Sequence, residues 1–109
     1  MTKSLGFYDE CAISALLSAA HSLGAESVDV TDSSCGDFRH LYFDANPDAV
    51  EDSVLELLDG GDTDYEFSFY TENDQHLGTF YVCLGNDDGS AVYDSSCQKW
   101  CDKVWDAIA

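Results

Sequence analysis

The sequence predicts an α+β domain in which a mostly antiparallel, four-stranded sheet packs on helices. Apolar residues recur every three or four positions in three segments, and they alternate with polar residues in the segments between them. The resulting order, α-β-β-α-β-β-α, places pairs of adjacent strands between helices, which favours the α+β class. A length of 109 residues suits one domain, so residues 1–109 are expected to form a single acidic α+β domain.

The first helix is expected over residues 7–23, where the apolar positions follow the helical period. Ser4 is a suitable N-cap for this helix, and Gly24 is placed to end it. Strands are expected next over residues 26–31 and 38–43, because β-branched and aromatic residues concentrate there.

The second helix is expected to begin at Asn46 and Pro47, since Asn caps helices well and Pro suits the first helical position. Two glycines at 60–61 end it. An apolar stripe marks one side of this helix, and acidic residues occupy the rest of its surface. These acids are Asp48, Glu51, Asp52, Glu56 and Asp59.

Residues 63–71 alternate between apolar and polar side chains and predict a half-buried strand. Residues 77–84 are its expected hairpin partner. Ser95 and Gln98 resemble a capping box, so the last helix is expected to begin there and to run to the C-terminus.

The charge is strongly negative, with 22 Asp and Glu against 4 Lys and Arg, a formal net charge of −18. Such a chain repels polyanions, which argues against direct binding to nucleic acid or to anionic membranes. Six Phe, six Tyr and two Trp supply the bulky side chains that disordered acidic chains lack. The chain has no apolar run of membrane-spanning length and no secretory signal, so we expect it in the cytoplasm of the host cell.

The pattern of reactive residues predicts a protein without enzymatic activity, metal or cofactor. The five cysteines are odd in number and irregularly spaced, which favours reduced thiols and buried packing roles. No nucleophile motif surrounds any Cys or Ser, and the three His lack metal-ligand spacing. The acidic residues 59–66 do not form a complete calcium loop, and the glycine pair has no basic neighbour that would favour a phosphate.

The acids of the second helix run in sequence directly into those of the following hairpin, which predicts one acidic ridge. A domain of this length is roughly 34 Å across, and about 31 Å of duplex DNA also carries about 18 charges. We therefore expect a basic partner to bind this ridge, and we expect an aromatic side chain of this protein to anchor the interface. The predicted partner-binding residues are Asp48, Glu51, Asp52, Glu56, Asp59, Asp62, Asp64, Glu66 and Tyr70.

A short, strongly acidic, single-domain chain with no catalytic motif resembles the small inhibitors of phages and mobile elements that imitate nucleic acid, of the anti-CRISPR and anti-restriction type. The resemblance rests on the charge of the whole chain and on clusters such as residues 59–66. It implies inhibition by occupying the positively charged DNA-binding or guide-binding groove of a bacterial defence complex.

Other interpretations of the same acidity stay open. An immunity protein or antitoxin that neutralises a nuclease toxin would use the same electrostatics against another basic partner. A halophile-adapted cytosolic domain, or a solvated surface without a partner, would be acidic for solubility alone. A small enzyme would need a deep pocket with perturbed titratable groups.

Overall fold

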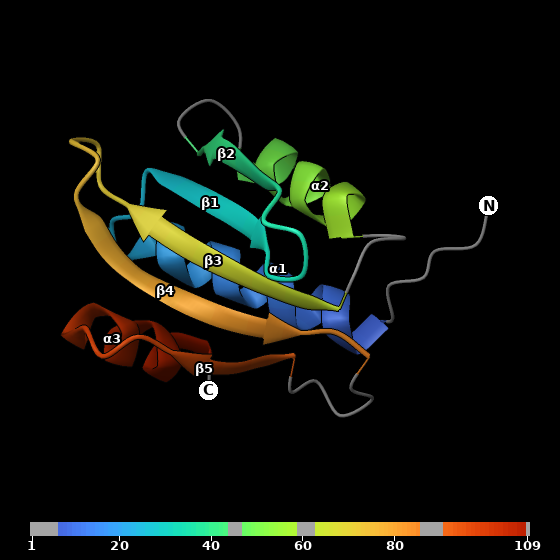
Figure 1. The fold of residues 1–109 in the computed structure, drawn as a ribbon. Helices are drawn as coiled ribbons and strands as arrows, with labels where there is room; N and C mark the ends of the chain where they lie inside the picture. Colours follow the sequence, from blue (N-terminus) through green and yellow to red (C-terminus); the bar gives the residue numbers. More distant parts are fainter. Residues whose placement is uncertain (1–6, 44–46, 59–62, 86–90, 109) are drawn as a thin grey trace.

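The computed structural model describes residues 7–43, 47–58, 63–85 and 91–108, and it has the predicted α+β architecture (Figure 1). In chain order, its elements are α1 (Phe7–Ser22), β1 (Ser27–Asp32), β2 (Phe38–Tyr42), α2 (Pro47–Leu58), β3 (Asp64–Tyr70), β4 (His76–Cys83), β5 (Val92–Ser95) and α3 (Lys99–Ile108). Each of the four predicted strands is present to within one residue at either end.

The sheet has five strands in the order β2-β1-β3-β4-β5, and each neighbouring pair is antiparallel. The prediction of four strands is therefore wrong, and the element order is α-β-β-α-β-β-β-α. The additional strand, β5, has only four residues and pairs with β4 at the sheet edge. A strand this short gives almost no alternation signal, and its Tyr93 and Asp94 are exposed.

The start of the last helix was also predicted wrongly. Ser95 belongs to β5 rather than to a helix cap, and its hydroxyl accepts a hydrogen bond from Trp105 Nε1 at 2.8 Å. α3 begins at Lys99, and the carbonyl of Gln98 accepts the Cys101 N–H. Cys97 consequently precedes the helix and is exposed, whereas Cys101 is buried.

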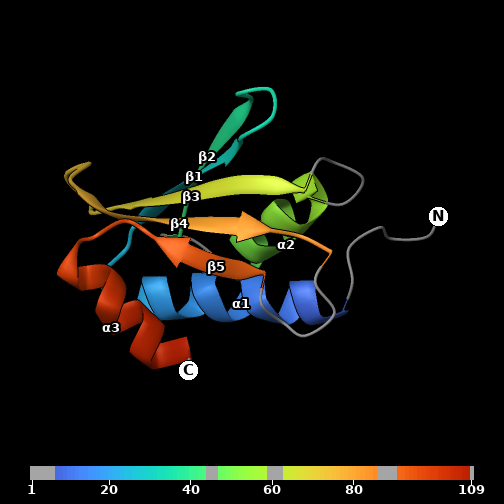
Figure 2. The ribbon, with the colours of Figure 1, turned by 60° about the horizontal axis from the view of Figure 1, so that its bottom comes forward.

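Figure 2 shows α1 and α3 beneath the sheet, with α2 farther back beside α1. The covered side of the sheet and the helices share one core of buried apolar side chains. The strands contribute Val28, Val30, Tyr65, Phe67, Phe69, Phe80 and Val82, and the helices contribute Ile13, Leu16, Leu17, Ala20, Val50, Val54, Leu58, Cys101 and Val104. The predicted alternation of β3 is confirmed, because Tyr65, Phe67 and Phe69 are all buried.

A close approach between α3 and β4 depends on a glycine. A Cβ atom at Gly78 would lie 2.3 Å from Cys101 Sγ and 3.3 Å from Trp100 Cε3. The rings of Trp100 and Trp105 both lie against Phe80, with centroids 6.3 and 5.5 Å away. Within the described ranges, the helices are too short or too polar to cross a bilayer.

Candidate functional site

One side of the sheet is left uncovered by the described helices, because all of them pack on the other side (Figures 1 and 2). We call this side the open face. Alternation along each strand and the pairing register define its members. They are Ser27, Asp29, Thr31, Phe38, His40, Tyr42, Asp64, Glu66, Ser68, Tyr70, His76, Thr79, Tyr81, Cys83 and Asp94.

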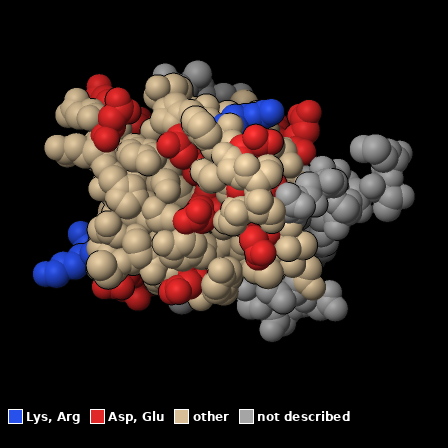
Figure 3. Space-filling model, viewed as in Figure 1, with Lys and Arg blue, Asp and Glu red and all other residues tan. Residues whose placement is uncertain are grey.

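The open face is negatively charged. Its members include the carboxylates of Asp29, Asp64, Glu66 and Asp94 and include neither Lys nor Arg. Figure 3 views the molecule from this side: acidic side chains are spread over much of the surface, and Lys and Arg appear only near its margins. A surface of this kind attracts cationic groups from a distance.

The predicted ridge residues fall on different surfaces. Asp64 is exposed and Glu66 and Tyr70 are half-buried, and all three lie on the open face through β3. A second group belongs to α2, on the helical side of the sheet. This group is Asp48, Glu51, Asp52 and Glu56, of which Asp52 and Glu56 are exposed.

Glu51 of α2 lies apart from the predicted acids of β3. It lines a groove between α1 and α2 rather than the open face, because α2 packs its apolar stripe into the helical layer. Asp59 and Asp62, which would connect the two groups in sequence, lie outside the described residues. The predicted ridge acids that the structure describes therefore belong to two groups, one on the open face and one on α2.

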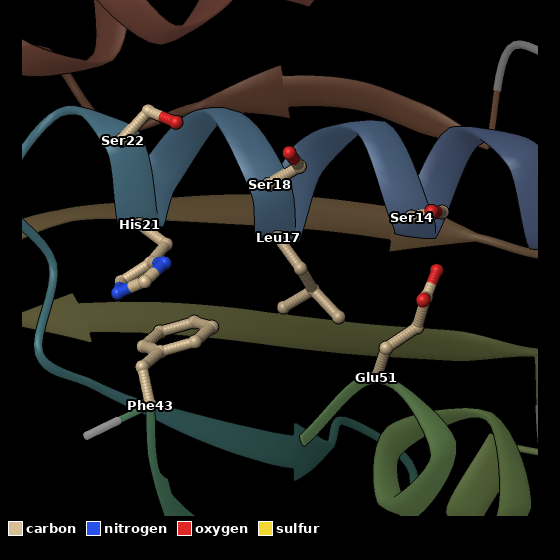
Figure 4. Close-up of a pocket in the computed structure, with 7 residues that line it drawn as sticks. All are labelled: Ser14, Leu17, Ser18, His21, Ser22, Phe43 and Glu51. Carbon is tan, nitrogen blue, oxygen red and sulfur yellow. The ribbon is translucent and has the colours of Figure 1, made fainter. Parts of the chain in front are cut away.

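The groove between α1 and α2 encloses about 200 Å³ and is shown in Figure 4. Ser14, Ser18 and Ser22 line it along α1. The His21 ring stacks on Phe43 at one end, with centroids 5.0 Å apart and ring planes 15° apart. The Glu51 carboxylate lies toward the other end, beside Ser14 (Figure 4). The carboxylate does not face the imidazole, so the groove has no serine–histidine–carboxylate relay.

A second feature lies on the open face, where rings and carboxylates border a shallow depression of about 350 Å³. Its lining residues are Asp29, His40, Tyr42, Tyr70 and Asp74, and we call it the tyrosine slot. His40 Nδ1 is hydrogen-bonded to Asp29 Oδ1. The His40 ring lies edge-on to Tyr42 at 4.6 Å and is 6.5 Å from the ring of Tyr70.

A hydrogen-bond network continues from the slot across the sheet. The Tyr70 ring lies 5.5 Å from that of His76, whose Nε2 is 2.9 Å from Thr79 Oγ1. Thr79 Oγ1 is also 2.8 Å from Ser68 Oγ, and the Thr79 N–H donates to Ser96 Oγ at 2.9 Å. These bonds connect β3, β4 and the segment before α3, so they hold this part of the open face in a fixed arrangement.

Two groups of the open face, Tyr70 and Cys83, have raised pKa values and therefore favour their neutral forms. Partial burial raises the pKa of Tyr70, and the negative charge of Asp29 raises it further. A hydrogen bond to Asp64 raises the pKa of Cys83, with burial as the next cause. A protonated thiol is a weak nucleophile, so Cys83 is not activated at neutral pH.

The cysteines match the expectation of buried packing roles only in part. Cys101 packs in the core, whereas Cys11, Cys35 and Cys97 are exposed. All five cysteines lie in the described ranges, and none of them forms a disulfide bond. Across the residues that the structure describes, no three His, Cys, Asp or Glu side chains come close enough together to hold a metal ion.

Sequence reasoning identified Tyr70 but missed Asp29, His40 and Tyr42 as possible site residues. The alternation in residues 38–43 does place His40 and Tyr42 on one side of a strand. Only the pairing of β1 with both β2 and β3 brings them beside Tyr70. The sequence gives no signal for that strand order.

The fold and the open face together define a class of protein: an acidic α+β domain whose described helices all cover the same side of the sheet. Comparisons with known protein families, with curated proteins and with solved structures found no match to this chain.

Proposed function

We propose that this protein is a non-enzymatic inhibitor that binds a basic partner in place of nucleic acid. The partner is a DNA-binding or guide-binding protein of a bacterial defence complex, and the open face occupies its positively charged groove. The observation that carries the proposal is the composition of the open face, with four carboxylates and no Lys or Arg among its members.

The total charge supports imitation of nucleic acid. The molecule is 38 Å long, and duplex DNA of that length carries about 22 charges, against a formal charge of −18 on this chain. A groove that attracts a duplex therefore attracts this protein with comparable strength. Such attraction speeds association and weakens as salt screens the charges.

Aromatic side chains support a specific interface in addition to general attraction. Phe38 and Tyr42 are exposed at one edge of the open face, at 68% and 59% of their maximal accessible area, and Tyr70 and Tyr81 are half-buried near its centre. Large aromatic residues are frequent hot spots in protein interfaces. Their position among carboxylates suits a partner surface rich in Lys and Arg.

The test compares two variants that remove the same charge from different surfaces. The open-face variant is Asp64→Asn/Glu66→Gln/Asp94→Asn, and its matched control is Asp52→Asn/Glu56→Gln/Asp102→Asn in the helices. Wild type and both variants serve as baits in bacterial lysate at low and high salt, and the captured protein is identified and purified. We expect wild type and the helical control to capture the same partner at low salt, and the open-face variant to lose it.

A second measurement tests the imitation itself. Duplex DNA, or the guide where the partner uses one, should compete with this protein for the purified partner. Equal loss of capture by both variants would mean that net charge alone acts. Loss of capture by the helical variant alone would assign binding to the helices instead of the open face. Either result would overturn the proposal for the open face. Simultaneous binding of nucleic acid and this protein would overturn the proposal, and a nuclease toxin as partner would replace it with an immunity role.

A further inference from the structure

The tyrosine slot has a geometry that the rest of the open face lacks. Ser27 of β1 pairs with Tyr42 of β2 on one side and with Tyr70 of β3 on the other. Two strand spacings separate the tyrosines, so their backbones are roughly 10 Å apart. The residue between them is small. The two large rings therefore stand on either side of a serine, with His40 and Asp29 in the next row of the sheet.

The residue between the two tyrosines, Ser27, is a buried polar residue. Ser27 is only 1% exposed, and its Oγ atom has no hydrogen-bond partner among the described residues. Buried hydroxyl groups almost always have a partner in native structures. Ser27 does not line the depression, so its part in the slot is to leave space between the two tyrosine rings.

Two carboxylates define the charge that a molecule bound in the slot must carry. Asp29 is part of the slot wall and bonds His40, and Asp74 approaches from the β3–β4 turn. Asp74 has a left-handed backbone with φ of 60°, and its N–H donates to the Thr71 carbonyl at 3.0 Å. Because Asp29 and Asp74 are both negatively charged, the slot is unfavourable for anions. The charge of Asp29 also raises the pKa of Tyr70, which shows a negative potential at this position.

The residues that line the slot favour an organic cation over a metal ion. A metal ion needs several ligands that converge on one point, and the described residues contain no such group. Aromatic faces instead attract organic cations. A guanidinium group is planar, stacks on tyrosine rings and carries five N–H donors, whereas a lysine ammonium is compact and strongly hydrated. The carboxylates of Asp29 and Asp74, beside the two tyrosine rings, suit the guanidinium best.

We propose that the tyrosine slot binds the guanidinium group of an arginine side chain on the partner protein. The inference deepens the function proposed above and rests on it, since it names the group of the basic partner that the open face recognises. The guanidinium stacks against the tyrosines, and its N–H groups donate to the carboxylates of Asp29 and Asp74.

The test uses small probes and the intact chain, without the partner. Isotope-labelled protein is titrated with N-acetyl-arginine amide, N-acetyl-lysine amide and N-acetyl-citrulline amide while amide chemical shifts are followed. Citrulline has the shape of arginine without the charge. We expect saturable shifts centred on Ser27, Asp29, His40, Tyr42 and Tyr70 with the arginine probe, weaker binding of the lysine probe, and no saturable shifts with citrulline.

Two tyrosine variants provide a matched control. Tyr42 and Tyr93 are both 59% exposed and lie in the two edge strands of the sheet, β2 and β5. Tyr42→Ala should weaken binding of the arginine probe about two- to fivefold, the effect of one exposed cation–π contact. Tyr93→Ala should leave it unchanged. Amide shifts away from the substitution report whether each variant keeps the fold.

Several results would overturn the arginine site. These are equal binding of the lysine and arginine probes, saturable binding of citrulline, shifts scattered over the molecule, and equal effects of the two tyrosine variants. The failure of the slot can be separated from failure of the proposed function, because the open-face triple variant changes none of the five slot residues. If that variant loses partner capture and the wild type does not bind the arginine probe, the proposed inhibitor function is retained and only the arginine site is rejected.

Discussion

The two sides of β3 differ in both burial and charge. Tyr65, Phe67 and Phe69 are buried against the helices, with at most 3% exposure. Between them, Asp64, Glu66 and Ser68 point to the opposite side of the sheet, where no described helix covers them. The comparison shows how one strand can stabilise the fold and also display negative charge.

The covered side has to compensate for the charge on the open side. A surplus of like charges destabilises a compact state through self-repulsion. On the covered side, Phe67, Phe69 and Phe80 are fully buried, and Phe69 and Phe80 contact each other edge to face at 6.0 Å. Burial of a large apolar side chain contributes about 1.5–3 kcal/mol, which is more than a typical exposed charge pair costs.

The largest expected difference in stability is between substitutions of two neighbouring residues of β3, one on each side of the sheet. Phe67→Ala should lower the free energy of unfolding by about 3–5 kcal/mol, because it leaves a cavity in the core. Ser68→Ala removes hydrogen bonds on the open side, including the one to Thr79, and should cost about 1 kcal/mol. Denaturant unfolding of both variants measures the difference. Equal losses would contradict the assignment of stability to the covered side.

A smaller effect is expected where α3 approaches the covered side of β4. Gly78→Ala places a methyl group against Cys101 Sγ, so we expect a loss of about 1–3 kcal/mol from overpacking. The double variant Gly78→Ala/Cys101→Ala removes the sulfur and should be more stable than the two single losses predict. A double-mutant cycle from unfolding measurements checks this coupling. Strict additivity would show that the two positions do not press on each other.

The smallest effect concerns the open face. Raising NaCl from 10 to 500 mM shortens the Debye length from about 30 Å to well under 10 Å, so it should raise thermal stability by reducing repulsion. Asp64→Asn/Glu66→Gln should diminish this gain by about 1 kcal/mol or less, as expected for exposed charges. Melting temperatures across the salt series measure it. A stability independent of salt in the wild type would contradict self-repulsion on this surface.

Predictions from the sequence succeeded where the signal is local. The period of residues 7–23 and the alternation of 63–71 depend on a few neighbouring side chains, and both elements are present in the structure. Ser95 was misassigned because the serine–glutamine spacing of a capping box also fits a strand end, and only the contact with Trp105 distinguishes them. The candidate site was predictable in part: Asp64, Glu66 and Tyr70 lie on the open face, whereas Glu51 lies in the α1–α2 groove.

The sequence by itself determined the class of the fold, the excess of acidic residues and the assignment of each residue of β3 to one of two sides. These properties follow from composition and from the geometric period of a helix or a strand, which need no knowledge of distant contacts. Only the tertiary structure decided which strands are neighbours. That choice depends on how the buried surfaces of all elements fit together, and it alone brings Tyr42, Ser27 and Tyr70 into one row.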